Sequence, residues 1–187
     1  FFSTLDEYRE AKKNINFPDF FVIPNGSDLT KFKIEREENI KERKIKRIVY
    51  FGRIHKKKGI EILLKSIKAM PKSFFLNFNF EITGPGEDDY IKKIKNLIKE
   101  YSLNNIVSLL PPKKREEKIN YLKNIDVFIL PSYEEGDSIA LKEAMSLGIP
   151  VLISKQCRMN IVENQNAGFI IKTEIQSLIE SLNKLQN

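Results

Sequence analysis

The chain has 187 residues, of which 41% are hydrophobic and 30% charged, a composition typical of a globular protein with one main hydrophobic core. No apolar run approaches the roughly 18 to 20 residues of a membrane-spanning helix, and the single cysteine, Cys157, excludes an internal disulfide and a cysteine-based zinc cluster. The formal net charge of +7 suits phosphates, nucleic acid or an anionic membrane surface, although a solvated lysine-rich surface has the same signature.

The amino-terminal part of the sequence indicates a piece of a longer chain. Residues 1–21 begin without Met and lack the basic region, apolar stretch and cleavage site of a secretory signal. Residues 22–26, "VIPNG", favour a short strand that ends in a turn, because Gly26 can adopt a positive φ. The charged stretch 33–47 predicts a surface connection to the strand expected at residues 47–51.

From residue 47 onward, short apolar runs alternate with segments whose apolar residues lie three and four positions apart. The predicted strands cover residues 47–51, 75–83, 105–110, 126–130, 150–154 and 168–172. The predicted helices cover residues 59–70, 88–101, 115–125, 138–147 and 173–185. This alternation predicts an α/β fold, a doubly wound, Rossmann-like parallel sheet with helices on both faces. Ligands of such folds bind at the carboxyl ends of the strands, so the loops that follow strands form the candidate site.

The loop after the first predicted strand contains Gly52, Arg53 and Lys58. A glycine at a strand end lets a ligand approach the backbone, and an arginine with a lysine can hold one anion between them. Such a loop suits a pyrophosphate, although a merely solvated basic loop is the more common case. His55, the only histidine, has no second histidine or cysteine to share a metal, so no metal site is predicted.

The loop after the second predicted strand contains Gly84 and Gly86 on either side of Pro85. These glycines could admit a flat or phosphorylated ligand against the backbone, but such pairs are also common in plain strand-to-helix turns. Only two of the three glycines of a dinucleotide fingerprint are present, and the P-loop pattern is missing.

The loop after the fourth predicted strand leads into a helix for which Asp137 or Ser138 can serve as the N-cap. Gly136 gives the turn before this helix conformational freedom. The amides of the first turn of the helix, together with the helix dipole, could hold a diphosphate. Glu135 precedes this helix and Glu143 lies eight positions further on, roughly 8 to 12 Å away at 1.5 Å per residue. That separation suits two hydroxyl-bearing parts of one extended ligand.

A plainer interpretation of the two glutamates stays open. In that case Glu135 is a surface loop residue and Glu143 a helix residue paired with Lys142 or another nearby lysine. Spacing alone slightly favours this interpretation.

Taken in order, five segments resemble the donor-binding domain of the GT-B glycosyltransferases, specifically the retaining enzymes called group 1 or family 4. They are "VIPNGSDLTKF", "YFGRIHKKKGIEILLKSI", "FEITGPGEDDYIKKI", "NIDVFILPSYEEGDSIALKEAMSLGIPVLIS" and "NAGFII". Taken individually, only the Glu-x₇-Glu stretch is specific for this family. Five matching segments in the same order argue against a chance match.

The resemblance implies a role for each matching residue. Arg53 and Lys58 would hold the donor diphosphate, Glu143 would accept hydrogen bonds from the ribose, and Glu135 would face the donor sugar. The predicted catalytic residues are therefore Arg53, Lys58 and Glu135, and the predicted donor-binding residues are Gly52, Gly84, Gly86, Gly136, Asp137, Ser138 and Glu143. No metal ligand and no cofactor are expected beyond the nucleotide diphosphate sugar.

The sequence departs from the family pattern at three places, one of which is Asn160, where many relatives have a glutamate. Asp137 stands where relatives often have an aromatic residue, and Pro111 and Pro112 stand where relatives commonly have a glycine. Uridine, guanosine and adenosine all stay open as the donor base.

On this resemblance we expect the donor half of a retaining, metal-independent glycosyltransferase of bacterial surface polysaccharide or glycolipid synthesis. Residues 1–32 would be the end of the acceptor domain and the interdomain connection, and residues 33–187 the donor domain. We expect it to be inactive without the missing amino-terminal domain, and cytoplasmic, with any contact to the inner face of the membrane made through that domain.

Two alternatives are a sugar-nucleotide epimerase of the same fold and a non-catalytic module that binds nucleotides or nucleic acid. The basic pair and the full Glu-x₇-Glu segment favour sugar transfer over epimerisation. Against the binding module, no motif of an RNA- or DNA-binding fold and no basic stripe with interleaved aromatics is present, so no nucleic-acid partner is expected.

Overall fold

The computed structural model of the protein describes residues 1–16, 19–23, 25–26, 47–159 and 161–186. The predicted surface connection 33–47 lies outside the described residues except for Arg47, and so does the expected domain boundary at residue 32.

Six parallel strands form one sheet in the order β3-β2-β1-β4-β5-β6. They are β1 (Arg47–Phe51), β2 (Asn79–Thr83), β3 (Val107–Leu110), β4 (Val127–Leu130), β5 (Val151–Ser154) and β6 (Gly168–Ile171). The chain runs from β1 outward to β3 and then returns to place β4 on the other side of β1. The doubly wound fold is thereby confirmed, with its change of direction between β1 and β4.

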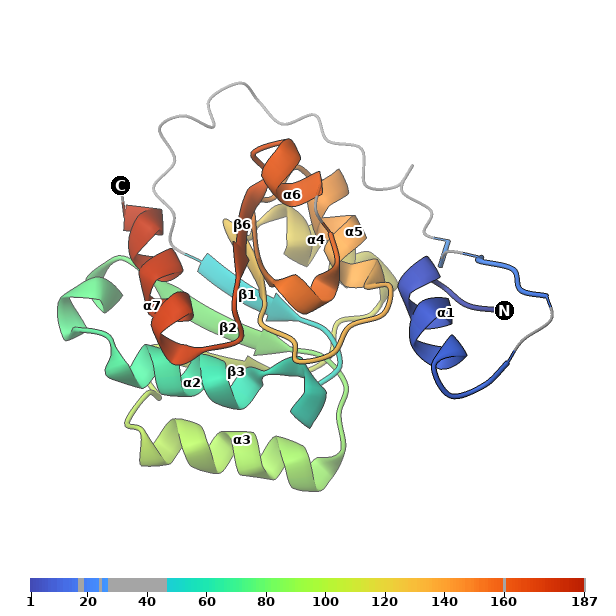
Figure 1. Cartoon of the computed structure of the whole chain (residues 1–187). Helices are drawn as coiled ribbons and strands as arrows, with labels where there is room; N and C mark the ends of the chain where they lie inside the picture. The colour runs from blue at the N-terminus through green and yellow to red at the C-terminus, as the bar shows by residue number, and fades with distance from the viewer. Residues whose placement is uncertain (17–18, 24, 27–46, 160, 187) are drawn as a thin grey trace.

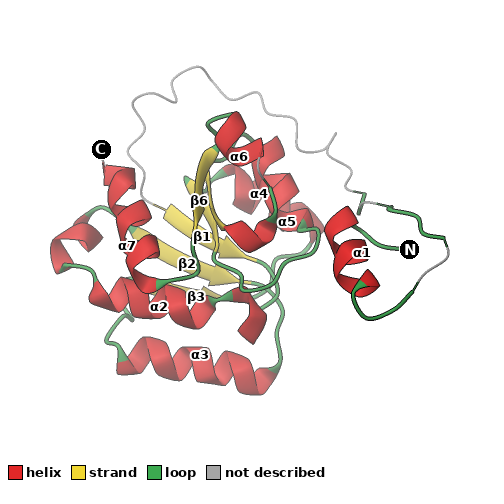
Figure 2. Ribbon diagram, viewed as in Figure 1, coloured by secondary structure: helices red, strands yellow, loops and turns green. Residues whose placement is uncertain are grey.

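Helices cover both faces of the sheet. The α-helices of the described residues are α1 (Leu5–Lys12), α2 (Ile60–Ala69), α3 (Asp88–Glu100), α4 (Arg115–Lys123), α5 (Ile139–Ser146), α6 (Ile161–Asn164) and α7 (Ile175–Asn183). Figure 1 shows α2, α3 and α7 on one side of the sheet and α4, α5 and α6 on the other, with α1 beside α5 at the edge of the molecule. The strands lie between these two layers in Figure 2, as expected for strands buried on both faces.

The hydrophobic pattern explains why these segments adopt these structures. All four residues of β4 and of β5 are buried, as in a strand covered on both faces. Helix α2 buries Ile60, Leu63, Leu64 and Ile67, which lie three or four positions apart on one face and pack in the common core. Among the described helices, none is long and apolar enough to span a membrane.

One predicted strand was wrong at its start. Residues 75–83 were expected to be extended, but residues Lys72–Leu76 form a 3₁₀ turn after Pro71 and β2 begins at Asn79. The turn buries Phe74 and stacks its ring on that of Phe78, with centroids 4.5 Å apart. Aromatic burial in a helical turn therefore prevails over the β propensity of this run.

The amino-terminal segment also differs from expectation. Of residues 22–26, the described ones (22, 23, 25 and 26) belong to no named strand, and Val22 makes one isolated parallel bridge with Phe2. Helix α1, which the sequence interpretation did not include, begins with a capping box between Thr4 and Glu7. The Ser3 hydroxyl and nearby amides hydrogen-bond to the Glu7 carboxylate and hold its pKa below the usual value, against the opposing effect of partial burial.

Candidate functional site

The loops that carry the predicted site residues lie at one edge of the sheet, because they follow the carboxyl ends of neighbouring parallel strands. They are residues 52–59 after β1, residues 84–87 after β2 and residues 131–138 after β4. The first and last of these flank the change of direction between β1 and β4. Strand order therefore places two loops that are far apart in the sequence next to each other.

The β1 and β4 loops are fastened together by backbone and side-chain contacts. The Tyr133 amide donates a hydrogen bond to the Lys57 carbonyl at 2.8 Å, and the Lys57 ammonium pairs with Glu134 at 2.7 Å. Gly59 begins α2 with φ +70°, and a Cβ there would lie 1.9 Å from the Pro131 carbonyl oxygen. Only glycine permits this approach, which brings the residue before it, Lys58, against the β4 loop.

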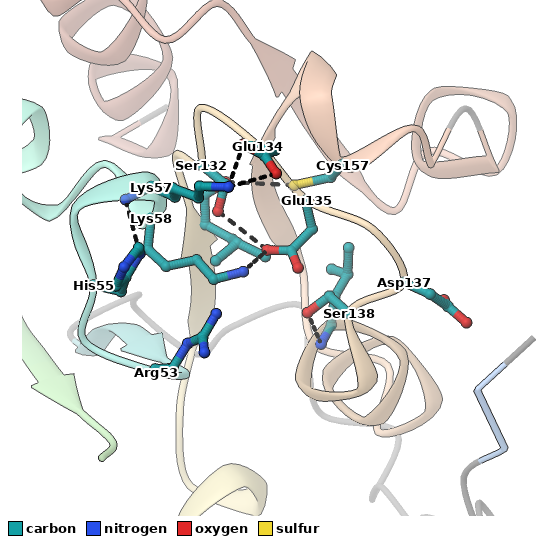
Figure 3. Close-up of polar contacts among 12 residues, drawn as sticks. Arg53, His55, Lys57, Lys58, Ser132, Glu134, Glu135, Asp137, Ser138 and Cys157 are labelled. Atoms are coloured by element: carbon teal, nitrogen blue, oxygen red, sulfur yellow. Dashed lines mark hydrogen bonds and ion pairs between the residues drawn. The ribbon is translucent and has the colours of Figure 1, made fainter. Parts of the chain in front are cut away.

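Lys58 and Glu135 form the central ion pair of the site. The ammonium lies 2.7 Å from Glu135 Oε2, and the two side chains are only 15% and 9% exposed. The Ser132 hydroxyl donates a second hydrogen bond, 3.2 Å long, to the same carboxylate oxygen. Figure 3 shows the Arg53 guanidinium extending toward this pair. The structure thus brings these three charged residues to one place, and their predicted roles in donor binding and catalysis stay a prediction.

The backbone of Arg53 is held by a buried phenol. Tyr50 donates a hydrogen bond from its hydroxyl to the Arg53 carbonyl at 2.6 Å. Burial raises the pKa of Tyr50 well above its usual value, so the hydroxyl stays a neutral donor. The exposed Arg53 side chain therefore extends from a fixed backbone.

Gly84 and Gly86 have a packing role that the sequence interpretation did not include. Gly84 has φ +148°, and a Cβ there would lie 1.9 Å from the carbonyl oxygen of Gly52. Gly86 forms a parallel bridge with Ile54, whose amide donates to the Pro85 carbonyl at 2.7 Å. The glycines let the β1 and β2 loops meet backbone to backbone, and ligand contact at Gly52, Gly84 and Gly86 stays a prediction.

Glu143 is buried in α5 and is paired with a lysine from another helix. Its side chain is 7% exposed, and Oε1 accepts a hydrogen bond from Lys118 of α4 at 2.7 Å. Oε2 lies 2.5 Å from the same ammonium, and among the described residues no other group donates a hydrogen bond to this buried oxygen. The plainer interpretation was wrong for Glu135, whose side chain is only 9% exposed. It was correct that Glu143 is a helix residue paired with a lysine, although the partner is Lys118.

Lys118 is the residue of this site that sequence reasoning missed. It lies 25 positions before Glu143, in α4, outside every motif considered. Lys142, the partner that the surface interpretation suggested for Glu143, instead pairs with Asp137 at 2.6 Å. Local spacing cannot reveal a pair formed between two helices.

Asp137 points away from the Lys58 and Glu135 pair, as Figure 3 shows. One of its carboxylate oxygens accepts the Asn25 amide at 2.8 Å and the Lys142 ammonium at 2.6 Å. Its carbonyl accepts a third hydrogen bond, from the Asn25 side chain, at 3.1 Å. The Asp137 carboxylate therefore binds the amino-terminal segment and does not face the predicted diphosphate position.

The neighbours of Asp137 complete the loop. Ser138 caps α5 by accepting the Leu141 amide at 3.3 Å, which confirms the expected N-cap. A Cβ at Gly136 would lie 2.3 Å from Glu7 Oε1 of α1. The amino-terminal segment and the predicted donor loop are thus in contact at both Gly136 and Asp137.

Two other features bear on the chemistry of this edge. Cys157 is buried near Glu135, and burial raises the pKa of its thiol to about 11, so it is not a nucleophile near neutral pH. Across the described part of the chain, no group of three or more His, Cys, Asp or Glu residues could hold a metal ion. An open depression of about 430 Å³ lies further along, between Lys155, Lys172 and the start of α7, and no predicted site residue lines it.

Comparison with known proteins gives a consistent result. Residues 31–187 match the family model described as glycosyl transferases group 1. An uncharacterised glycosyltransferase of Haemophilus influenzae is 28% identical over 163 residues, which cover 85% of this chain and 43% of that protein. The UDP-Gal:alpha-D-GlcNAc-diphosphoundecaprenol alpha-1,3-galactosyltransferase of Escherichia coli is 33% identical over 172 residues, which cover 86% of this chain and 43% of that protein.

One solved structure resembles this chain over most of the length of both proteins. It is described as the C-terminal domain of a glycosyl transferase group 1 family protein, LpcC, from Francisella tularensis. The two share a TM-score of 0.70 at 21% identity, over 86% of this chain and 87% of that one. The first curated relatives are much longer, and the chain spans between 31% and 44% of their length.

Proposed function

Because the chain belongs to the group 1 glycosyltransferases, which have the GT-B fold, we propose that it is the donor-binding half of a retaining, metal-independent sugar transferase. Its ligand is a nucleotide diphosphate sugar. The transferred sugar goes to a glycan or lipid acceptor that is bound by a domain preceding residue 33. Residues 1–32 then belong to the end of that domain and to the connection.

The observation that carries the proposal is the burial of two carboxylates near the change of strand direction between β1 and β4. Each of them lies beside a lysine. Glu135 and Glu143 are 9% and 7% exposed, and their partners are Lys58 and Lys118. Buried ion pairs recover little net stability after desolvation, so their presence at a ligand edge favours a functional explanation. Beside its contact with Lys118, the Glu143 carboxylate keeps acceptor capacity that suits a ligand hydroxyl.

Arg53 and Lys58 supply the charge that sugar transfer requires. Breaking the bond between sugar and phosphate develops negative charge on the departing diphosphate and positive charge on the sugar ring. The two cations extend toward one region, and α5 begins beside it with its first-turn amides. Fixed protein cations in this position stabilise the leaving group, and this supports a reaction without a metal ion.

The two carboxylates hold the two sugar rings of the donor in this proposal. Glu143 accepts hydrogen bonds from the ribose, and Glu135 positions the transferred sugar. Glu135 is a positioning group here, because an acceptor attacks from the same face as the leaving group and a departing phosphate oxygen takes the acceptor proton. In this proposal the amides of Gly136, Asp137 and Ser138 contact the donor sugar and the phosphates.

The proposal extends to the cellular role only through relatives. The Escherichia coli relative is named for transfer of galactose from UDP-Gal to a lipid-linked sugar. We propose a related step of bacterial surface polysaccharide or glycolipid synthesis, in the cytoplasm, with the acceptor domain making any contact with the membrane surface. The donor half alone then binds donor without efficient transfer.

The experiment that tests this function is a ligand panel followed by calorimetry. UDP, GDP, ADP and their sugars are first compared by thermal shift, because a ligand at 100 times its dissociation constant stabilises the native state by about 2.7 kcal/mol. Calorimetry on the best ligand should give one-to-one saturation. Binding that instead follows polyanion length and weakens steeply with salt would overturn the proposal in favour of a nucleic-acid-binding module.

A further inference from the structure

We propose that Lys118 is a positioning residue of the nucleotide site, which holds the Glu143 carboxylate so that Oε2 accepts a hydrogen bond from a ribose hydroxyl. This inference rests on the proposed function, since it requires that a nucleotide ribose reach Glu143. It adds a residue that lies outside the motifs of the sequence.

The geometry of the pair points to a carboxylate held from one side. The Lys118 ammonium donates to Glu143 Oε1 at 2.7 Å and lies 2.5 Å from Oε2, so it contacts both oxygens from one side. Oε2 is buried and accepts no hydrogen bond from any other group among the described residues. An ionised carboxylate has about four acceptor positions, so this oxygen keeps acceptor capacity for a hydroxyl donor.

Lys118 is itself held in place by packing. Its side chain is 23% exposed, and its ammonium lies 5.6 Å from the centre of the Phe51 ring. Phe51 is the last residue of β1 and immediately precedes the loop with Arg53 and Lys58. Lys118 thereby connects α4 to the end of β1 and to α5, the two elements that carry the proposed diphosphate and ribose contacts.

Electrostatics explains why a cation is needed at this point. A buried carboxylate without a partner is strongly disfavoured in its charged form and responds by taking up a proton or turning toward water. Either response would remove the acceptor that a ribose hydroxyl needs. A lysine that contacts both oxygens balances the buried charge and fixes the orientation of the carboxylate, and the remaining acceptor positions of Oε2 stay available to a hydroxyl.

The test compares nucleotides with and without ribose hydroxyls. The variant is Lys118→Met, which keeps most of the side-chain length and removes the charge. Lys118→Arg is the conservative variant, and Lys123→Met, an exposed lysine at the end of the same helix, is the control. Dissociation constants are measured by calorimetry for UDP, GDP and ADP and for their 2′,3′-dideoxy forms.

For the native protein, loss of the hydroxyls should weaken binding roughly tenfold to a hundredfold, as for a hydrogen bond to a charged group. Lys118→Met should reduce this ratio to about threefold or less by weakening the ribose form and sparing the dideoxy form. Lys118→Arg should keep most of the ratio, and Lys123→Met all of it. Adding Glu143→Gln to Lys118→Met should cause little further loss, because both changes remove one coupled interaction.

Equal weakening of both nucleotide forms would overturn the inference, since a general structural role does not distinguish hydroxyls. An unchanged ratio in Lys118→Met would overturn it as well. If Lys118→Met does not fold, by circular dichroism and thermal unfolding, Lys118→Gln takes its place in the same comparison. Absence of nucleotide binding by the native protein would overturn the proposed function together with the inference. If Lys118→Met and Lys118→Gln both keep the native ratio between ribose and dideoxy nucleotides, only the role of Lys118 is rejected.

Discussion

The Lys58 ammonium lies 2.7 Å from the Glu135 carboxylate although the two residues are 77 positions apart in the chain. The pair links the loop after β1 to the loop after β4, and a proposed phosphate ligand and a carboxylate therefore compete for one cation. Substitution of Lys58 and substitution of Glu135 should therefore have different effects on nucleoside diphosphate binding.

Lys58→Ala should weaken binding of the nucleoside diphosphate selected by the ligand panel by tenfold or more, because it removes a charged hydrogen bond worth roughly 1.5 to 3 kcal/mol. The much weaker binding of the corresponding nucleoside, which has no phosphate, should stay nearly unchanged. Calorimetry measures both. Lys57→Ala is the matched control, since the neighbouring exposed lysine pairs with Glu134. Equal loss for nucleoside and diphosphate would reject the assignment of Lys58 to the phosphates.

Glu143→Ala should weaken nucleoside diphosphate binding about tenfold to a hundredfold, because a buried charged acceptor for the ribose is lost. Its effect should disappear when the ligand lacks the 2′ and 3′ hydroxyls. The measurement is the dissociation constant for each ligand form, after thermal unfolding has shown that the variant is folded. A loss of the same size for the dideoxy ligand would show that Glu143 has no contact with the ribose.

Glu135→Gln should bind nucleoside diphosphate at least as tightly as the native protein. The substitution removes a negative charge beside the proposed phosphate position and releases Lys58 from its ion pair. The additional affinity for the nucleotide sugar over the plain diphosphate should fall, because the carboxylate that positions the sugar is gone. Isothermal calorimetry with both ligands gives this difference. A tenfold weaker affinity for the plain diphosphate would instead mean that Glu135 acts mainly by orienting Lys58.

Nucleotide binding should survive an excess of EDTA, because Arg53, Lys58 and the α5 amino terminus supply the positive charge that a divalent ion would otherwise provide. The dissociation constant is compared with and without chelator, and again with added Mg²⁺ or Mn²⁺. A strict divalent-metal requirement for donor binding would contradict the proposed chemistry.

Gly84→Ala should destabilise the protein by about 1 to 3 kcal/mol or more, since φ is +148° and the new Cβ would lie 1.9 Å from the Gly52 carbonyl oxygen. Gly26→Ala is the control, because no atom of the described residues lies within 4 Å of a Cβ at that position. Urea unfolding provides both free energies of unfolding. Equal stability of the two variants would mean that the approach of the β1 and β2 loops is easily relaxed.

The order of the elements was accessible from the sequence because it depends on local pattern. A buried strand such as β4 is a continuous apolar run in the sequence. A helix such as α2 buries one face, so its apolar residues recur every three or four positions. Both patterns can be recognised in the sequence. The prediction for residues 75–78 failed because Phe74 and Phe78 stack on each other in a helical turn. Helix α1 was missed because its signal is short, consisting mainly of the Thr4 and Glu7 capping box.

The sequence by itself determined the residue types at the ends of the strands, and with them the basic pair and the spacing of Glu135 and Glu143. Only the tertiary structure decided which charges meet: Lys58 with Glu135, Lys118 with Glu143, and Asp137 with Lys142 and Asn25. Strand order is the physical reason, because placing β4 beside β1 and α4 against α5 joins side chains that are distant in sequence. No local period encodes that neighbourhood, which arises when the apolar faces of all the elements are buried together.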